Sequence, residues 1–205
     1  MAAAEDEIME LVDSGEFERA TETVIDAYGS ELYNYIRKLC GDPHLADDAF
    51  QSFSIDLWEG LESFEGRSSI ETWAYTVARN AAYQLMRKQG RKKERPLYTD
   101  EQRRLAERWT RSATKNWEKT EAKHWLWEIV EEFGSEAREL FVLRIGNQKS
   151  WREIAEIVED DDLEGKELSR ASARLRKRYQ RLKEKLRKRR DEFDESEMRA
   201  ASSEE

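Results

Sequence analysis

Apolar side chains recur every three or four residues through most of this chain, and sustained strand-like alternation of apolar and polar residues is absent. This spacing extends to about residue 28, with one break at the sequence DSGE. It then continues through the segment SELYNYIRKLCG. Such spacing gathers apolar residues on one face of an α-helix. Only 2 prolines and 9 glycines occur among 205 residues, too few for a β-rich chain with many turns. The sequence therefore predicts an all-α fold.

Cap residues predict where one helix ends and the next begins. Gly41 follows the apolar positions of SELYNYIRKLC and is expected to end that helix in the left-handed conformation. Asp42 is expected to be the N-cap of the next helix and Pro43 its first residue. An N-cap side chain accepts a hydrogen bond from a free backbone N–H, and proline fits the first turn because it lacks that N–H.

Two further helix starts are predicted by capping-box spacing. Ser68 and Glu71 stand three residues apart ahead of an apolar run, and Ser150 and Glu153 repeat the arrangement. In a capping box, each of the two side chains accepts a hydrogen bond from the backbone N–H of the other residue.

The helix after the loop FEGRSS is expected to have two unlike faces. Amide and guanidinium groups can hydrogen-bond base edges, and aromatic rings can stack on unpaired bases. The polar face therefore indicates nucleic-acid binding, with an ordinary solvated helix face as the alternative. The apolar stripe comprises Ile70, Trp73, Ala74, Val77, Ala78, Ala81 and Leu85, and the expected polar face comprises Thr72, Thr76, Arg79, Asn80, Tyr83 and Arg87.

The net charge of −9 conceals two basic islands. Residues 67–95 hold eight basic and two acidic residues, and residues 164–190 hold thirteen basic and three acidic ones. The first 66 residues, in contrast, carry 17 acidic residues and only three basic ones. This distribution indicates two separate elements that meet a polyanion while the rest of the chain avoids it.

A second helical unit begins near His124 with the segments HWLWEIVEEFG, SEARELFVLRIG and SWREIAEIVED. Two helices, a connector and a basic helix are typical of a helix-turn-helix, whose second helix enters the major groove of DNA. A coiled-coil arm is also compatible with the leucine spacing, so both interpretations remain open. The long basic helix carries Leu168, Leu175, Tyr179, Leu182 and Leu186 along one side.

Residues 94–123 between the two units are mixed in charge and show no clear apolar stripe. We expect a linker with some helical tendency, in which Trp109 and Trp117 pack on a neighbouring domain or partner.

Several classes of protein are excluded by composition. The single Cys40 leaves no disulfide framework, and His44 and His124 are the only histidines, so no Cys/His cluster has metal-ligand spacing and we expect no metal site and no cofactor. The first 18 residues lack the basic and apolar segments of a signal peptide. No apolar run is long enough to span a bilayer, so we expect a cytoplasmic protein without membrane insertion.

The stretches YGSELYNYIRKLCGDPHLADDAFQSF, DLW and FEGRSSIETWAYTVARNAAYQLMRK resemble the second conserved region of bacterial RNA polymerase sigma factors of the extracytoplasmic-function (ECF) group. Members of this group contain only the second and fourth sigma regions. The stretch SEARELFVLRIGNQKSWREIAEIV, with EIA at residues 153–155, and the basic stretch RLRKRYQRLKEKL are similar to the fourth region. The resemblance implies that the chain selects promoters for the polymerase and is not itself an enzyme.

The resemblance also implies roles for particular residues. The helix around DDAFQS would dock on the clamp helices of the largest polymerase subunit, the FEGRSS loop and the next helix would melt and read the minus-ten element, and the basic helix would contact the minus-thirty-five element. These roles fall on Asp47, Asp48, Gln51 and Ser52 for polymerase binding, on Arg67, Ser68, Ser69, Thr76, Arg79, Asn80, Tyr83, Arg87 and Lys88 for the minus-ten element, and on Arg174, Arg176, Lys177, Arg178 and Arg181 for the minus-thirty-five element.

The chain departs from the family pattern at three places. Ser54 replaces a large apolar residue, and Tyr83 often has an acidic counterpart, so the promoter preference of relatives does not transfer. The segment EDDDLEGKELSRASA is longer than the usual turn between the two fourth-region helices. Either this connector is expanded or the recognition helix begins before Arg174.

The expected organisation is two small helical domains joined by a polar linker. Core RNA polymerase and promoter DNA are the implied partners, and an anti-sigma factor could be a third. A DNA-binding helix-turn-helix regulator, or an anti-sigma-type adaptor that does not support initiation, remains the alternative function. The expected boundaries are 1–93 for sigma region 2, 94–123 for the linker, 124–190 for sigma region 4 and 191–205 for a disordered acidic tail.

Overall fold

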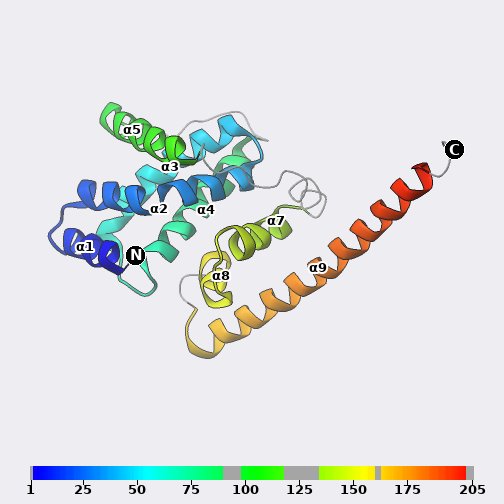
Figure 1. The fold of residues 1–205 in the computed structure, drawn as a ribbon. Helices are drawn as coiled ribbons and strands as arrows, with labels where there is room; N and C mark the ends of the chain where they lie inside the picture. Colours follow the sequence, from blue (N-terminus) through cyan, green and yellow to red (C-terminus); the bar gives the residue numbers. More distant parts are fainter. Residues whose placement is uncertain (1, 90–97, 118–133, 160–162, 202–205) are drawn as a thin grey trace. The chain divides into compact units, whose positions relative to one another are not determined.

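The computed structural model describes residues 2–89, 98–117, 134–159 and 163–201 (Figure 1). Every regular element in these ranges is helical, which confirms the predicted all-α fold. Among the described residues, no helix combines the length and the apolar character needed to cross a bilayer. The elements are α1 (Ala2–Asp13), α2 (Phe17–Cys40), α3 (Pro43–Gly60), the 3₁₀ turn η1 (Leu61–Ser63), α4 (Ile70–Gln89), α5 (Asp100–Trp117), α7 (Ser135–Phe141), the π-helical turn η2 (Val142–Gly146), α8 (Trp151–Val158) and α9 (Gly165–Ala201).

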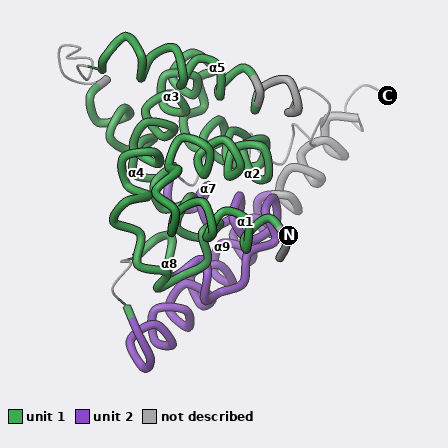
Figure 2. The backbone as a smooth tube through the Cα atoms, turned by 90° about the vertical axis from the view of Figure 1, so that its left-hand side faces the viewer, with its two compact units in different colours: residues 1–122, 156–163 green, residues 123–155, 164–205 purple. Residues whose placement is uncertain are grey.

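The chain divides into two compact units, which Figure 2 distinguishes by colour. The first contains residues 1–122 and 156–163, and the second contains residues 123–155 and 164–205. The first unit thus holds α1 to α5, and the second holds α7, α9 and the start of α8.

Helix α2 is central to the first unit, because it contacts α1, α3, α4 and α5. Aromatic rings connect three of these helices in the core. The Tyr35 ring of α2 packs edge-on against Tyr75 of α4 at 5.2 Å between ring centres, and Tyr33 packs edge-on against Phe50 of α3 at 5.6 Å. Edge-to-face pairs of this kind stabilise a core beyond the apolar area that they bury.

The predicted boundary between α2 and α3 is confirmed. Gly41 follows α2 with φ of +71°, a left-handed conformation that glycine adopts without a steric penalty. The Asp42 carboxylate accepts a hydrogen bond of 2.8 Å from the backbone N–H of Leu45, and Pro43 is the first residue of α3. The sequence therefore specifies this turn locally, independently of the rest of the fold.

Ser54, where the resemblance led us to expect a large apolar residue, is fully buried in α3. Its hydroxyl donates a hydrogen bond of 2.8 Å to the backbone oxygen of Phe50. A buried hydroxyl that is satisfied within its own helix costs little, so the core accommodates this substitution.

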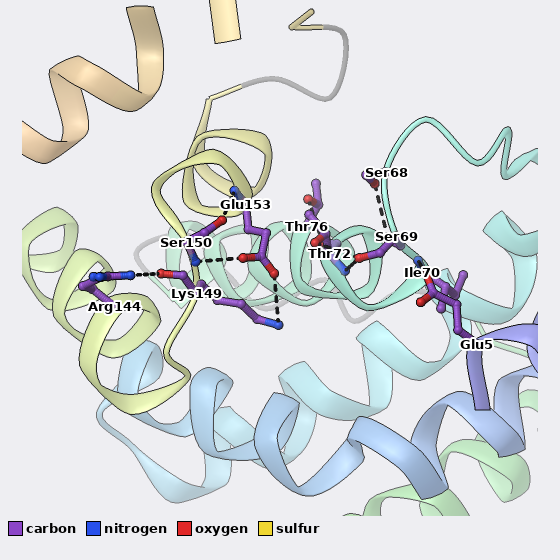
Figure 3. A network of polar contacts seen from close by, with 10 residues as sticks. All are labelled: Glu5, Ser68, Ser69, Ile70, Thr72, Thr76, Arg144, Lys149, Ser150 and Glu153. Atoms are coloured by element: carbon purple, nitrogen blue, oxygen red, sulfur yellow. Dashed lines mark hydrogen bonds and ion pairs between the residues drawn. The ribbon is translucent and has the colours of Figure 1, made fainter. Parts of the chain in front are cut away.

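The predicted cap of α4 is wrong by one residue. Ser69, not Ser68, accepts a hydrogen bond of 3.1 Å from the backbone N–H of Thr72 (Figure 3). Glu5 of α1 supplies a second acceptor, 3.3 Å from the N–H of Ile70. Ser68 instead donates a long hydrogen bond of 3.4 Å to the backbone oxygen of Ser69. Glu5, 65 residues before Ile70, therefore helps to cap α4. Spacing within the local sequence cannot reveal such a contact.

Helix α4 is buried around more of its circumference than the sequence predicted. The expected apolar stripe is confirmed as a buried or half-buried face, but Tyr75 and Ala82 are also fully buried. Thr72 and Thr76, assigned to the polar face, are only 2% and 8% exposed. The reason is that α4 packs against both α2 and α3, so only a narrow strip reaches solvent.

Part of the predicted linker is instead a packed helix. Helix α5 contacts α2 and α3, and its residues Ala106, Trp109 and Ala113 are buried. The prediction of no apolar stripe fails because, of the four buried positions that the structure describes in α5, two are alanines and one is Thr110, and a hydropathy pattern weights these residues weakly. Trp109 does pack on the neighbouring domain, as expected, and Trp117 lies where side chains are not described.

The second unit is assembled around Tyr179 of α9. Its ring centre lies 5.0 Å from that of Phe141 at the end of α7 and 5.3 Å from that of Trp151 at the start of α8. The predicted capping box of α8 is confirmed, because Ser150 and Glu153 exchange hydrogen bonds of 2.8 and 3.2 Å (Figure 3). In the same turn, Arg144 donates to the backbone oxygen of Lys149 at 2.8 Å.

Helix α9 begins at Gly165, about two and a half turns before the first predicted contact at Arg174. The segment EDDDLEGKELSRASA is therefore not all connector, and its second part belongs to the basic helix. Helix α9 also continues to Ala201, so residues 191–201 of the predicted disordered tail are helical.

Candidate functional site

The exposed strip of α4 carries the amide, aromatic and guanidinium groups that the sequence singled out. Asn80 and Arg87 are exposed, and Tyr83 lies between them, half-buried. The Arg79 guanidinium carbon lies 4.8 Å from the centre of the Tyr83 ring. This cation–π contact supports one side of the ring and favours this orientation of Tyr83 at the surface.

The loop before α4 places further polar groups next to this strip. Gly66 has φ of +69°, which lets the chain turn sharply between Glu65 and Arg67. Arg67 is exposed and pairs with Glu65 at 3.4 Å. Ser69 is engaged as the cap of α4, so it acts on this loop mainly by fixing where the helix begins.

Lys88 lies near Asp56 of α3 as well as at the end of the exposed strip of α4. Burial raises the pKa of the Asp56 carboxyl, and the nearby charge of Glu59 raises it further. A hydrogen bond from Ser52 and the positive charge of Lys88 both oppose this shift in pKa. Lys88 therefore compensates a partly buried carboxylate in addition to any role that it has at the surface.

The four candidate residues of α3 lie on one side of that helix but differ in accessibility. Asp48 is exposed and Gln51 is half-buried. The Asp47 carboxylate accepts a hydrogen bond of 2.6 Å from the Tyr33 hydroxyl. Ser52 is only 2% exposed, and its hydroxyl lies 2.8 Å from that of Tyr98.

A solvent-open pocket of about 300 Å³ lies beside these α3 residues. Its walls come from α3, from the end of α4, from Tyr98 and from the first turns of α5. Sequence reasoning missed the α5 side because residues 94–123 looked like a linker. The residues that line it are Asp48, Gln51, Ser52, Leu85, Tyr98, Arg103 and Glu107.

In the second unit, the helical spacing of α9 separates a buried from an exposed face. Leu168, Ala171 and Leu175 are buried, which places Lys166 and Arg170 on the opposite, exposed side. These two cations lie in the first two turns of α9 and were missed, because the sequence left the start of this helix open. Among the predicted residues, Arg174, Arg176, Lys177, Arg178 and Arg181 are all exposed.

Arg178 and Arg176 of α9 contact other parts of the second unit. Arg178 forms an ion pair with Glu136 at the start of α7. Arg176 lines a groove at the start of α9 together with Trp151 and Ser169. Lys177 lies one turn after Ala173, on the same exposed side of α9 as Arg170.

The comparison with protein families decides what the first unit is. Residues 24–92 match the family described as Sigma-70 region 2. These residues form a sigma-70 region 2 domain. The match contains α3, α4 and most of α2, so it covers the polar strip of α4 and the candidate residues of α3.

Curated relatives of this sigma region 2 domain confirm the ECF resemblance. Over 82 residues the chain is 32% identical to the ECF RNA polymerase sigma factor SigX of Bacillus subtilis, a match that spans 40% of this chain and 42% of SigX. Over 85 residues it is 33% identical to the ECF RNA polymerase sigma factor SigG of Mycobacterium tuberculosis, spanning 42% of this chain and 21% of SigG. The chain thus matches less than half the length of these two relatives.

One relative matches beyond sigma region 2. The RNA polymerase sigma factor YlaC of Bacillus subtilis is 26% identical over 174 residues, which span 80% of this chain and 91% of YlaC. No solved structure matches the chain.

Proposed function

We propose that this chain is an ECF sigma factor that binds core RNA polymerase and directs promoter-specific initiation of transcription. The observation that carries the proposal is the exposed strip of α4, because Asn80, Tyr83 and Arg87 stand on a sigma-70 region 2 domain. Hydrogen-bonding, stacking and cationic groups in one row suit unstacked, single-stranded bases and their phosphates.

The minus-ten contacts are proposed to come from α4 and from the loop before it. Asn80 carries both a donor and an acceptor for a base edge. Tyr83 offers one ring face for stacking, since the Arg79 guanidinium lies against the ring. Arg67, Arg87 and Lys88 would contact phosphates. Thr76 is buried, and Ser69 caps α4, so their proposed part is to hold the surface in shape.

The polymerase contact is proposed to centre on Asp48 and Gln51. They are one helical turn apart on α3 and form a polar patch that reaches solvent. Asp47 and Ser52 flank this patch and are hydrogen-bonded to Tyr33 and Tyr98.

The minus-thirty-five contact is proposed to come from α9. The first turns of a recognition helix contact the bases in a helix-turn-helix, so Lys166 and Arg170 would read sequence. Arg174, Lys177 and Arg181 follow along the helix and would hold phosphates. Within the second unit, the packing of Leu168, Leu175 and Tyr179 favours this arrangement over a free coiled-coil arm.

The acidic remainder of the chain fits the same function. A strongly acidic protein binds DNA weakly by itself, so promoter contacts would form mainly after docking on polymerase. We also propose that the chain acts in the cytoplasm, has no catalytic residues of its own and is open to control by an anti-sigma factor.

Run-off transcription tests the proposal. Purified core polymerase is combined with genomic promoter fragments in the presence and absence of this protein. Discrete run-off products that require the protein would support a sigma factor. DNA binding without such products would favour a helix-turn-helix regulator, and polymerase binding without them would favour an adaptor that does not support initiation.

A further inference from the structure

We propose that α5, together with Tyr98, is an internal cover over the polymerase-docking patch of α3, and that polymerase binds after this cover has moved away. The inference rests on the proposed function, because it assigns the Asp48–Gln51 patch to polymerase. It adds a closed state of the free protein, in which the chain itself occupies part of that surface.

The cover contacts the C-terminal half of α3. At the docking patch, the Tyr98 and Ser52 hydroxyls are 2.8 Å apart. Further along α3, the Gln102 amide donates to the Glu59 carboxylate at 2.6 Å. The ring of Trp109 also packs edge-on against that of Trp58, with 6.4 Å between ring centres.

The other side of the cover is fixed to α2. Ala113 approaches Gly29 so closely that a Cβ atom on Gly29 would lie 3.4 Å from the Ala113 Cβ. Arg108 pairs with Glu22 and lies 3.7 Å from Glu18. The small residues permit close packing, and the charge of Arg108 is complementary to those of Glu18 and Glu22.

The position of the cover conflicts with docking on the same patch. Ser52 is 2% exposed, so a partner cannot reach its hydroxyl while Tyr98 is in place. Arg103 and Glu107 of α5 share the walls of a pocket with Asp48 and Gln51. A helix laid along α3 would therefore compete with Tyr98 and the first turns of α5 for the same space.

The contacts of the cover are of a kind that can be broken. The buried Nε1–H of Trp109 has no hydrogen-bond partner among the described residues, and a buried donor without a partner destabilises the docked state. Arg108 and its partners are about half exposed, where ion pairs contribute little. The buried apolar contact also relies on small side chains such as Ala106 and Ala113.

A reversible disulfide provides the test. Gly29→Cys with Ala113→Cys, in a Cys40→Ala background, brings two Cβ atoms to a separation close to the ~3.5–4.5 Å of natural disulfides. The new Cβ at residue 29 would also meet the Ile25 Cγ2 methyl at 3.0 Å, so this side chain must shift slightly. The Ile25 side chain is shifted in the reduced form too. The reduced form of this double-cysteine variant is therefore the control for its oxidised form.

The oxidised protein is expected to bind core polymerase at least tenfold more weakly than the reduced protein, and reductant should restore binding. Equal binding of both forms, with the disulfide verified by mass spectrometry, would overturn the cover. If the Cys40→Ala parent and the wild type both fail to bind polymerase, the proposed function itself is wrong. This outcome differs from equal binding of the two redox forms, which would overturn only the cover.

A second variant acts in the opposite direction and does not depend on the disulfide. Tyr98→Phe removes the hydroxyl that meets Ser52 and should raise the affinity for core polymerase about fivefold, as expected for the loss of one hydrogen bond from the closed state. The matched control is Tyr28→Phe, which removes a hydroxyl near Glu71 and Glu5 and should leave the affinity unchanged. An unchanged or lower affinity for Tyr98→Phe would contradict the proposal.

Discussion

The guanidinium of Arg79 lies against the ring of Tyr83, 4.8 Å from its centre and one helical turn away along α4. This contact orders a tyrosine on the exposed strip of a sigma region 2 domain, where a family member often has an acidic residue. A supported ring can accept an unpaired base by stacking, so we expect this departure from the family pattern to affect how the domain contacts melted DNA.

Replacement of Tyr83 should weaken promoter opening. Tyr83→Ala is expected to lose about 1–3 kcal/mol, the range for one stacked base, whereas Tyr83→Phe keeps the ring and most of the effect. The fluorescence of 2-aminopurine placed in the minus-ten element measures opening in the polymerase complex. Gln84→Ala is the control, since Gln84 is exposed on the neighbouring side of α4. Equal losses for the Ala and Phe variants would argue against stacking.

Introduction of positive charge into the Asp48–Gln51 patch of α3 should abolish polymerase binding. Asp48→Arg combined with Gln51→Arg changes a solvent-accessible patch, so the helical content should stay unchanged while co-purification with core polymerase is lost. Circular dichroism checks the first expectation and pull-down checks the second. His44→Arg, at an exposed position near the start of α3, serves as a control for added charge. Retained binding by the double variant would remove the docking assignment.

The start of α9 should determine sequence preference at the minus-thirty-five element. Arg170→Ala is expected to cost about 1–3 kcal/mol at preferred promoters and to relax preference at one position. Arg181→Ala should instead weaken all promoters alike and reduce the salt slope by about one unit. Arg187→Ala, about 26 Å beyond Arg170 along the helix, is the control. Binding titrations across promoter variants and salt concentrations separate these outcomes, and equal behaviour of Arg170→Ala and Arg181→Ala would contradict the assignment.

The partly buried Asp56 should make stability depend on pH. Its pKa is raised in the folded protein, chiefly by burial, so the folded state holds this proton more tightly than the unfolded state does. Folding stability therefore falls as pH rises through the folded pKa. Asp56→Asn removes that loss, and its thermal midpoint should exceed the wild-type value at pH 7 by a margin that shrinks toward pH 4. A margin that grows on acidification would show that the pKa is lowered instead.

The sequence predicted best those features that depend on a few neighbouring residues. Gly41, Asp42 and Pro43 define the α2–α3 turn through backbone preferences alone, and Ser150 with Glu153 caps α8 as their spacing indicates. The exposure of Asn80 also followed from helical periodicity.

Features that depend on tertiary packing were missed. Thr76 is buried because both α2 and α3 pack against α4. The spacing of apolar residues along α4 does not show how many helices pack against it. Helix α5 packs through Ala106 and Ala113, whose small side chains give almost no hydropathy signal. The cap of α4 depends on Glu5, which lies 65 residues away from Ile70 in the sequence.

The central claim is that the exposed strip of α4 opens promoter DNA and reads its bases. Permanganate footprinting of the melted region tests this most directly, with core polymerase, wild-type protein or Asn80→Ala, and a set of single-base minus-ten variants. Because Asn80 is exposed, its truncation should leave the thermal midpoint and polymerase binding unchanged. Opening should weaken by about 1–3 kcal/mol at preferred promoters, and preference at one minus-ten position should relax. A uniform reduction of opening, with base preference unchanged, would contradict the account.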